Sequence, residues 1–174
     1  MGQKLYLECY SGISGDMTVA ALSGLMKDRT PLFCVLDHMP VEGFSYELKQ
    51  VKKSGIDAWD FLVKLDAEHE NHDHDMEYLH GHSHEEHVHH DSIHKNGHHG
   101  RNLQEITRIL QAGNMSPYAL ELALKIFRIL AEAEGSVHGK PVDQVHFHEV
   151  GAVDSIIDIA AAAICLDDLQ VREV

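Results

Sequence analysis

Residues 4–17 read KLYLECYSGISGDM, and this stretch decides how the fold begins. Apolar residues alternate with other types over residues 4–9, which predicts a short strand. The serines and glycines of residues 11–16 predict a loop. A helix is expected over residues 17–26, where apolar side chains are available for packing. This order of strand, glycine loop and helix indicates the start of a mixed α/β domain.

The segments after this start predict a helix and a β-hairpin. Residues 31–38 are expected to form a short helix. Residues 44–51 and 56–65 are strand-like, and a Lys-Lys-Ser-Gly sequence separates them. Because such a sequence favours a tight turn, we expect the two segments to pair as antiparallel strands.

Three more helices are expected in the second half of the chain. Apolar residues between positions 103 and 110 fall on one helical face. Ser116 followed by Pro117 is a typical helix start, and Gly135 is the expected end of that helix. The last predicted helix, residues 152–169, is apolar on nearly every side and should be well buried.

The patterns together predict a single domain of mixed α/β (α+β) class over residues 1–174. It should contain a small mixed sheet, a β-loop-α start, a β-hairpin and a buried C-terminal helix. Residues 145–149 predict a short extended segment, and residues 171–174 the beginning of a further strand. No obvious cap follows, so we expect the chain to be part of a longer protein.

The composition favours a soluble protein that handles cations. The chain has 174 residues, 44% of them hydrophobic, and a formal net charge of −14. This acidic excess argues against nucleic acid or an anionic membrane as the main partner. The sequence contains neither a signal peptide nor a run of about 20 apolar residues. Three cysteines without a CxxC pair indicate reduced thiols, so a cytoplasmic location is expected.

Twelve of the 16 histidines lie between residues 69 and 99. This part of the chain has few apolar residues, so we expect a disordered His-rich insertion at about 67–100. So many flexible imidazoles predict loose capture of nickel, copper or zinc rather than one preorganised catalytic site.

The glycine loop is the first candidate site. A loop that leads into a helix exposes backbone N–H groups, which suits a phosphate or a carboxylate. Gly12 and Gly15 would allow a close approach of the ligand, and Ser11 and Ser14 could donate hydrogen bonds. Asp16 adds negative charge and would suit a bridging metal ion or a ligand hydroxyl. Alternatively, Ser14 or Asp16 is only the N-cap of the helix.

His146, Phe147, His148 and Glu149 form the second candidate site. Residues two apart on a strand share a face, so the two imidazoles would lie side by side while Phe147 points into the core. Two imidazoles with the Glu149 carboxylate suit nickel, zinc, manganese or iron. The alternative is a surface histidine pair at the end of a strand.

Asp154 and Asp158 lie four residues apart and therefore share a helix face. Asp154 has the simpler explanation that it caps the predicted helix. Asp158 is surrounded by apolar residues, and a buried carboxylate needs a cation or hydrogen-bond donors. It would be a metal ligand, a group that orients His146 or His148, or a cap for the glycine loop.

The cysteines carry weaker expectations. Cys9 precedes the glycine loop, where a nearby helix N-terminus would favour a thiolate that could bind a metal. The alternative, which the sequence favours, is that Cys9 is a small buried residue. Cys34 and Cys165 are expected to be core residues.

Two long strings carry a resemblance to a known family. They are LECYSGISGDM at residues 7–17 and HFHEVGAVDSIID at residues 146–158, and the His-rich run lies between them. The chain closely resembles the N-terminal region of the LarC family, the nickel-insertion proteins of nickel-pincer nucleotide biosynthesis. The resemblance spans almost all 174 residues and is weakest across residues 31–99.

This resemblance implies a CTP-dependent nickel chelatase, a lyase-type enzyme that needs Mn²⁺ or Mg²⁺. Such proteins insert nickel into pyridinium-3,5-bisthiocarboxylic acid mononucleotide, and the product is the cofactor of lactate racemase. Family members are longer than this chain, so CTP binding is expected in a C-terminal region beyond it. The implied partners are the mononucleotide, nickel, that C-terminal region and a second copy in a homo-oligomer.

The resemblance also suggests roles for the candidate residues. The substrate phosphate suits the glycine loop, while nickel and the thiocarboxylates suit His146, His148 and Cys9. Mn²⁺ or Mg²⁺ would prefer carboxylates, and the candidates are Asp16, Glu149, Asp154 and Asp158. Two alternatives remain: a module that only stores or delivers nickel, and an oligomerisation domain without catalysis.

Overall fold

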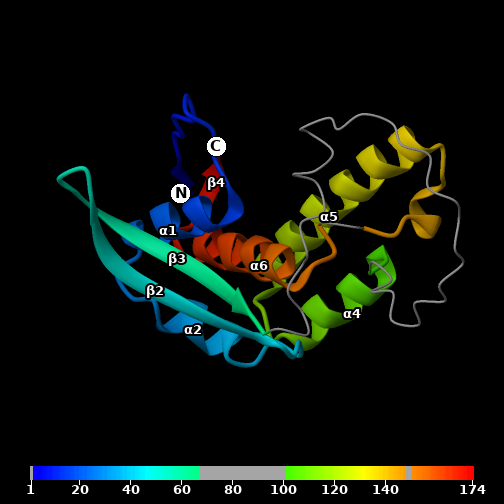
Figure 1. Cartoon of the computed structure of the whole chain (residues 1–174), viewed down its shortest axis with the longest axis horizontal. Helices are drawn as coiled ribbons and strands as arrows, with labels where there is room; N and C mark the ends of the chain where they lie inside the picture. Colours follow the sequence, from blue (N-terminus) through cyan, green and yellow to red (C-terminus); the bar gives the residue numbers. More distant parts are fainter. Residues whose placement is uncertain (1, 67–100, 148–149) are drawn as a thin grey trace, which may run out of the picture.

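The computed structural model describes residues 2–66, 101–147 and 150–174. The predicted His-rich insertion at 67–100, His148 and Glu149 lie outside the described residues. The rest folds into a mixed α/β domain, as the sequence predicts (Figure 1). Its strands form two separate two-stranded sheets, one parallel and one antiparallel, rather than one mixed sheet.

Strand β1 is much shorter than expected. It covers only Gln3–Lys4 and pairs in parallel with β4, Val171–Glu173, which confirms the strand predicted at the end of the chain. The last backbone hydrogen bond between the two segments runs from the Leu5 N–H to the Glu173 carbonyl oxygen at 2.9 Å. The prediction of a strand over residues 4–9 is therefore wrong beyond Lys4. Because β4 is only three residues long, its backbone has no further groups to pair with residues 6–9.

The two helices near the N-terminus follow the prediction closely. Helix α1 spans Gly15–Leu25, and helix α2 spans Thr30–Leu36. The Asp28 carboxylate accepts hydrogen bonds from the N–H and hydroxyl of Thr30, and these contacts satisfy polar groups at the start of α2.

The predicted hairpin is confirmed. Strands β2, Phe44–Lys53, and β3, Ile56–Leu65, pair antiparallel along their full length. Ser54 and Gly55 both have positive φ, so they form the two-residue turn that suits the twist of a hairpin. The first strand is two residues longer than predicted because this turn needs only those two residues. Helix α1 and the last helix α6, Val153–Asp168, pack against β3 (Figure 1).

Helices α4, Leu103–Ala112, and α5, Pro117–His138, form the other side of the molecule, followed by the short helix η1, Val142–Gln144. Ser116 caps α5 as predicted. The expected end at Gly135 is wrong, because α5 continues to Gly139, which has a φ of 63°. Gly135 instead allows close packing: a Cβ there would lie 2.7 Å from the Lys140 carbonyl oxygen.

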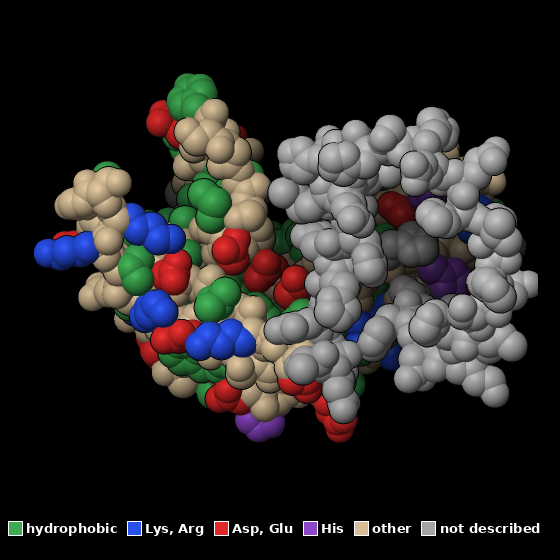
Figure 2. All heavy atoms as spheres, in the orientation of Figure 1, with side chains coloured by type: hydrophobic (Ala, Val, Ile, Leu, Met, Phe, Trp, Pro, Cys, Tyr) green, Lys and Arg blue, Asp and Glu red, His purple; other side chains and the backbone are tan. Residues whose placement is uncertain are grey.

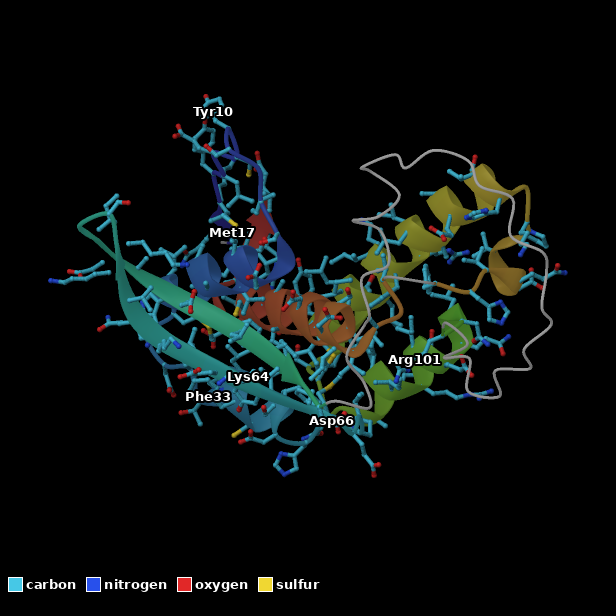
Figure 3. The ribbon with its side chains drawn as sticks, viewed as in Figure 1. Tyr10, Met17, Phe33, Lys64, Asp66 and Arg101 are labelled. Atoms are coloured by element: carbon cyan, nitrogen blue, oxygen red, sulfur yellow. The ribbon has the colours of Figure 1, made fainter. Side chains whose placement is uncertain are left out.

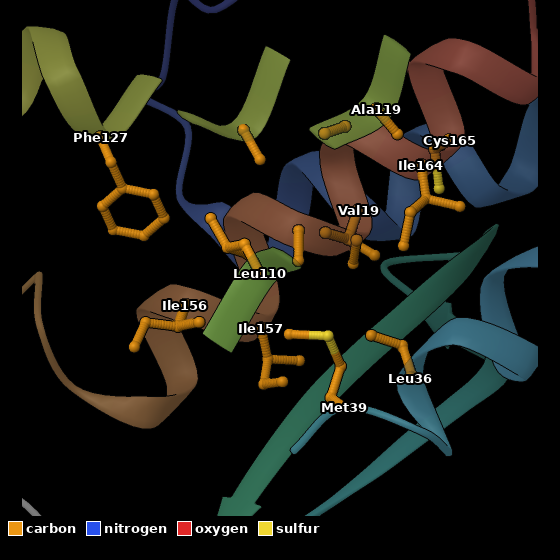
Figure 4. Close-up of a cluster of buried hydrophobic side chains, with 14 of the residues drawn as sticks. Val19, Leu36, Met39, Leu110, Ala119, Phe127, Ile156, Ile157, Ile164 and Cys165 are labelled. Carbon is orange, nitrogen blue, oxygen red and sulfur yellow. The ribbon is translucent and has the colours of Figure 1, made fainter. Parts of the chain in front are cut away.

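Helix α6, Val153–Asp168, is the centre of the fold and confirms the predicted buried helix. It contacts α1, α2, α5 and β3, so apolar side chains on most of its sides are covered. Figure 4 shows Ile156, Ile157 and Ile164 in this core together with residues from the surrounding elements. None of the described helices is long and apolar enough to cross a membrane.

Candidate functional site

Helix α1 begins directly against α6. The contact point is Gly15, where an added Cβ would lie 2.8 Å from the Cβ of Asp158. A side chain at position 15 would therefore force the two helices apart, so the close approach requires glycine. The structure in this way brings the end of the glycine loop onto the helix that carries Asp154 and Asp158.

Asp158 is the polar group of this contact that lacks a hydrogen-bond partner at one of its oxygens. This oxygen, Oδ1, is buried. The pKa of Asp158 is raised from 3.8 to about 7, chiefly by burial and in addition by the negative charges of Asp16 and Asp154, while a hydrogen bond from the Asp16 backbone N–H acts against this rise. A carboxyl group in this environment favours a proton or a cation beside it.

The same carboxylate also lies at the N-terminus of α1. The Asp16 N–H bonds to Asp158, so part of the positive helix end already faces a protein anion. Of the roles predicted for Asp158, the contact with the glycine loop is confirmed. The role of metal ligand stays a prediction, and no described contact joins Asp158 to His146.

Ser14 and Asp16 form a local network at the start of α1. Ser14 is the N-cap residue, but its side chain caps no helix amide. Its hydroxyl donates instead to Asp16 Oδ1, which also accepts the Met17 N–H at 2.8 Å. Ser14 is exposed and Asp16 is half-buried, so both keep part of their surface accessible to a ligand.

Asp154 lies one helical turn before Asp158. The N-cap of α6 is Ala152, so the prediction that Asp154 caps this helix is wrong. Its Oδ1 accepts the Ser155 N–H at 2.8 Å within the first turn. Asp154 thus adds negative charge beside Asp158 without being needed as the cap. Figure 2 shows acidic side chains gathered on the face over α1 and the start of α6.

Ser11 and Gly12 lie in the segment that projects from the domain. Gly12 has a φ of 88°, and its N–H donates to the Cys9 carbonyl at 3.1 Å in a tight turn. A Cβ on Gly12 would meet nothing within 4 Å, so this glycine is required by its backbone conformation rather than by close packing. Phosphate binding by Ser11, Gly12, Ser14 and Gly15 stays a prediction.

The cysteines differ from the expectations. Cys9 and Cys34 are exposed, so the expectation that they are buried is wrong for both. The apolar residues around Cys9 do not form a strand, and Cys34 lies on the outer side of the short helix α2. Cys165 is buried as predicted, and burial raises the pKa of its thiol to about 12.

His146 points outward between two buried residues, Val145 and Phe147. The Phe147 N–H bonds to the Arg101 carbonyl at 3.0 Å, and the Phe147 ring packs against Phe127. The prediction that His146 faces outward while Phe147 points into the core is therefore confirmed. The extended segment forms an isolated bridge between His146 and Asn102 rather than a longer strand. The imidazole of His146 is exposed, and its Nδ1 lies 3.3 Å from the Gln144 carbonyl oxygen.

The structure unites only part of the predicted site. One cluster forms where α1 meets α6, and we call it the α1–α6 carboxylate cluster. It contains Gly15 and the three acidic residues Asp16, Asp154 and Asp158. His146 has its contacts on the side of α4 and η1 instead. Within the described residues, no three His, Cys, Asp or Glu side chains are arranged to hold a metal ion. The pocket predicted to join the loop and the histidines thus stays a prediction.

Arg101 is a positioning residue that the sequence did not suggest. Its Nη1 donates to the Gly151 carbonyl at 2.8 Å. A Cβ on Gly151 would lie 2.8 Å from the Phe147 carbonyl oxygen, so the Gly151 backbone is packed closely against that of Phe147. Arg101 therefore holds Gly151, which lies just before the start of α6. Its only signal in the sequence is a basic residue between the His-rich run and the cap Asn102.

A family model described as nickel insertion protein matches residues 5–174. This match covers nearly the whole chain, including both candidate segments. The chain belongs to the nickel insertion protein family.

Three relatives carry the name pyridinium-3,5-bisthiocarboxylic acid mononucleotide nickel insertion protein. The chain is 45% identical over 174 residues to the one from Alkaliphilus metalliredigens, with 100% of this chain and 39% of the relative covered. It is 40% identical to the one from Akkermansia muciniphila, covering 99% and 37%. The protein of Geobacillus kaustophilus is 36% identical, covering 96% and 36%.

The chain spans less than two fifths of the length of these curated relatives. No solved structure significantly matches it.

Proposed function

We propose that this chain forms the metal and substrate side of an enzyme that inserts nickel into pyridinium-3,5-bisthiocarboxylic acid mononucleotide. The support is the α1–α6 carboxylate cluster, which lies inside the segment shared with relatives that carry this name. Its central residue, Asp158, has a buried oxygen without a partner. Burying such a group has a cost that a bound cation would offset.

The cluster fits Mn²⁺ or Mg²⁺ by the chemistry of its donors. Both ions prefer carboxylate oxygens, and Mg²⁺ is commonly held by one or two carboxylates together with a substrate phosphate. Asp158 and Asp16 would hold the ion, and Asp154 would add negative charge. A bound ion supplies positive charge for the substrate phosphate, which Asp16 and Asp158 alone would repel.

Nickel itself is the substrate metal in this proposal. His146, His148 and Glu149 are the proposed donors for it, because imidazoles suit nickel and carboxylates complete such sets. Ser11, Gly12, Ser14 and Gly15 are the proposed contacts of the mononucleotide. CTP would bind in the part of the enzyme beyond this chain, and the product would serve lactate racemase in the cytoplasm. The proposed enzyme class is a lyase-type nickel chelatase.

The experiment is nickel insertion by the full-length protein at saturating nickel, with single carboxylate variants. We expect Asp158→Asn and Asp16→Asn to lower product formation about tenfold or more, an effect typical of groups that support a metal site. Asp57→Asn is the matched control, because Asp57 is an exposed carboxylate on the hairpin. Equal activity of all three variants and the parent protein would contradict the proposed site.

The alternative function is nickel storage or delivery without catalysis. The twelve histidines between residues 69 and 99 favour it. Deletion of residues 69–99 separates the two functions in the full-length protein. As a reservoir, the run should matter only when nickel is scarce, so insertion at saturating nickel should persist after the deletion. A protein that binds nickel but never yields product would support storage instead.

A further inference from the structure

The projecting segment after β1 carries a surface that the described residues leave uncovered. It consists of Tyr6, Leu7, Tyr10, Ile13 and Met17, which we call the N-terminal rim. Tyr10 is 91% exposed, Tyr6 is 77% exposed, and Met17 and Ile13 are each at least half exposed. Figure 3 shows Tyr10 at the far end of this segment and Met17 at its base. Large apolar side chains that are this exposed along one segment are typical of an interface.

The backbone beneath the rim is an unfinished sheet. Strands β1 and β4 form a parallel pair with only two matched positions. Parallel strands are normally buried on both faces, and a pair this small has little stability of its own. Residues 5–9 keep the alternation of a strand, but past Leu5 they have no neighbouring strand among the described residues.

The position of β4 favours one candidate for the part of the protein that covers the rim. The match with the present chain covers only 39% of the relative from Alkaliphilus and 37% of the relative from Akkermansia, so each relative has a long further part. Because β4 runs parallel to β1, residues that follow the position of Val174 in such a relative leave β4 beside Tyr6 and Leu7. In such a relative, the part of the chain that follows β4 therefore begins next to the rim.

We propose that the N-terminal rim is the docking surface for the C-terminal part of the full-length protein. Residues 6–9 extend β1 as a strand in that interface, and Tyr6, Tyr10, Ile13 and Met17 pack against the C-terminal part. The occupant should be largely apolar, with basic groups at its edge, because residues 5–26 contain acidic residues but no Lys or Arg. The rim shares its segment with the proposed mononucleotide contacts at residues 11–15, so cover of the rim and insertion activity are measured separately.

Cys9 gives a direct measure of this cover, because it lies between the rim residues Leu7 and Tyr10 and is exposed. The full-length protein is treated with a maleimide in the presence of a chelator, and labelling of the Cys9 peptide is followed by mass spectrometry. We expect labelling at least about tenfold slower in the native than in the denatured protein, as for a site that reacts only after local opening. Equally fast labelling would overturn the proposal.

A rim variant tests the surface itself. Tyr10→Ser combined with Ile13→Ser should speed labelling of Cys9 in the full-length protein. Ile129→Ser, an exposed apolar position on α5, should leave it unchanged and serves as the matched control. Two results would overturn the choice of occupant: protection that falls on dilution, which indicates a second copy, and protection seen only with the mononucleotide, which indicates a ligand. Insertion activity is measured separately, so failure of either proposal is distinguishable.

Discussion

Asp158 and His146 were both expected to bind metal, yet the structure gives them opposite surroundings. Asp158 is packed against Gly15, has an oxygen without a partner and has a pKa near 7. His146 is exposed and pairs only through its backbone bridge and the nearby Gln144 carbonyl. The carboxylate site is therefore built into the core packing, whereas the imidazole is an accessible donor on a well-packed segment.

This difference shows where a substitution should affect folding and where it should affect function alone. The environment of Asp158 depends on the contact of two helices, so changes there should alter stability and its pH dependence. The environment of His146 depends on its neighbour Phe147, so the imidazole itself should be replaceable without cost to the fold.

The largest expected effect comes from Phe147, beside His146. Phe147→Ala should destabilise the protein by about 3 to 4 kcal/mol, because it leaves a cavity next to Phe127. His146→Ala should change the free energy of unfolding by less than about 0.5 kcal/mol. Denaturant unfolding of both variants measures the contrast. A large loss for His146→Ala would show that the imidazole has a structural role.

The next effect concerns the helix contact at Gly15. Gly15→Ala should destabilise the protein by about 2 kcal/mol, because the new Cβ overlaps Asp158. Gly12→Ala is the control for backbone strain: it should cost about 1 kcal/mol, since its φ is positive but the space around it is open. Thermal unfolding at neutral pH compares them. Equal losses would mean that α1 and α6 can separate freely.

The pH dependence of stability tests Asp158. Its pKa is raised in the folded state, so its contribution to stability is fully present below pH 4 and is lost as the pH rises from about 4 to about 7. Asp158→Asn removes this loss and should stabilise the protein by about 1 to 2 kcal/mol at pH 8, a value reduced because the side chain is partly exposed.

The advantage of Asp158→Asn should shrink toward pH 4, where Asp158 itself is protonated. Urea unfolding at several pH values in a chelating buffer measures this. An advantage that is constant with pH, or a destabilisation at pH 8, would contradict the pKa assignment. Asp57→Asn, on the exposed hairpin, should show no such dependence.

Much of the fold follows from local sequence patterns. Helix α6, the hairpin and the start of α5 could be predicted because periodicity and turn residues act within a few positions. The strand over residues 4–9 could not, because alternation does not show whether a partner strand is present. Gly135 and Gly139 likewise look equivalent in sequence, yet only Gly139 has the positive φ that ends α5.

The candidate site was predictable in residue type more than in arrangement. The apolar residues around Asp158 indicated a buried carboxylate, and the structure bears this out for its Oδ1, while the residue as a whole is half-buried. Its proximity to Asp16 and Gly15 depends on how α1 packs on α6, a contact between segments about 140 positions apart in the chain. Arg101 could not be recognised because its partner is a backbone carbonyl, which carries no signal in the sequence.

In the function proposed above, the α1–α6 carboxylate cluster holds a divalent cation. Its most direct test is Mn²⁺ binding at pH 8, followed by electron paramagnetic resonance, in full-length protein lacking the histidine run at residues 69–99. We predict one saturable site that Asp158→Asn weakens about tenfold or more and that Asp57→Asn leaves unchanged. Binding of equal affinity in the parent protein and Asp158→Asn, or no binding in either, would contradict the claim.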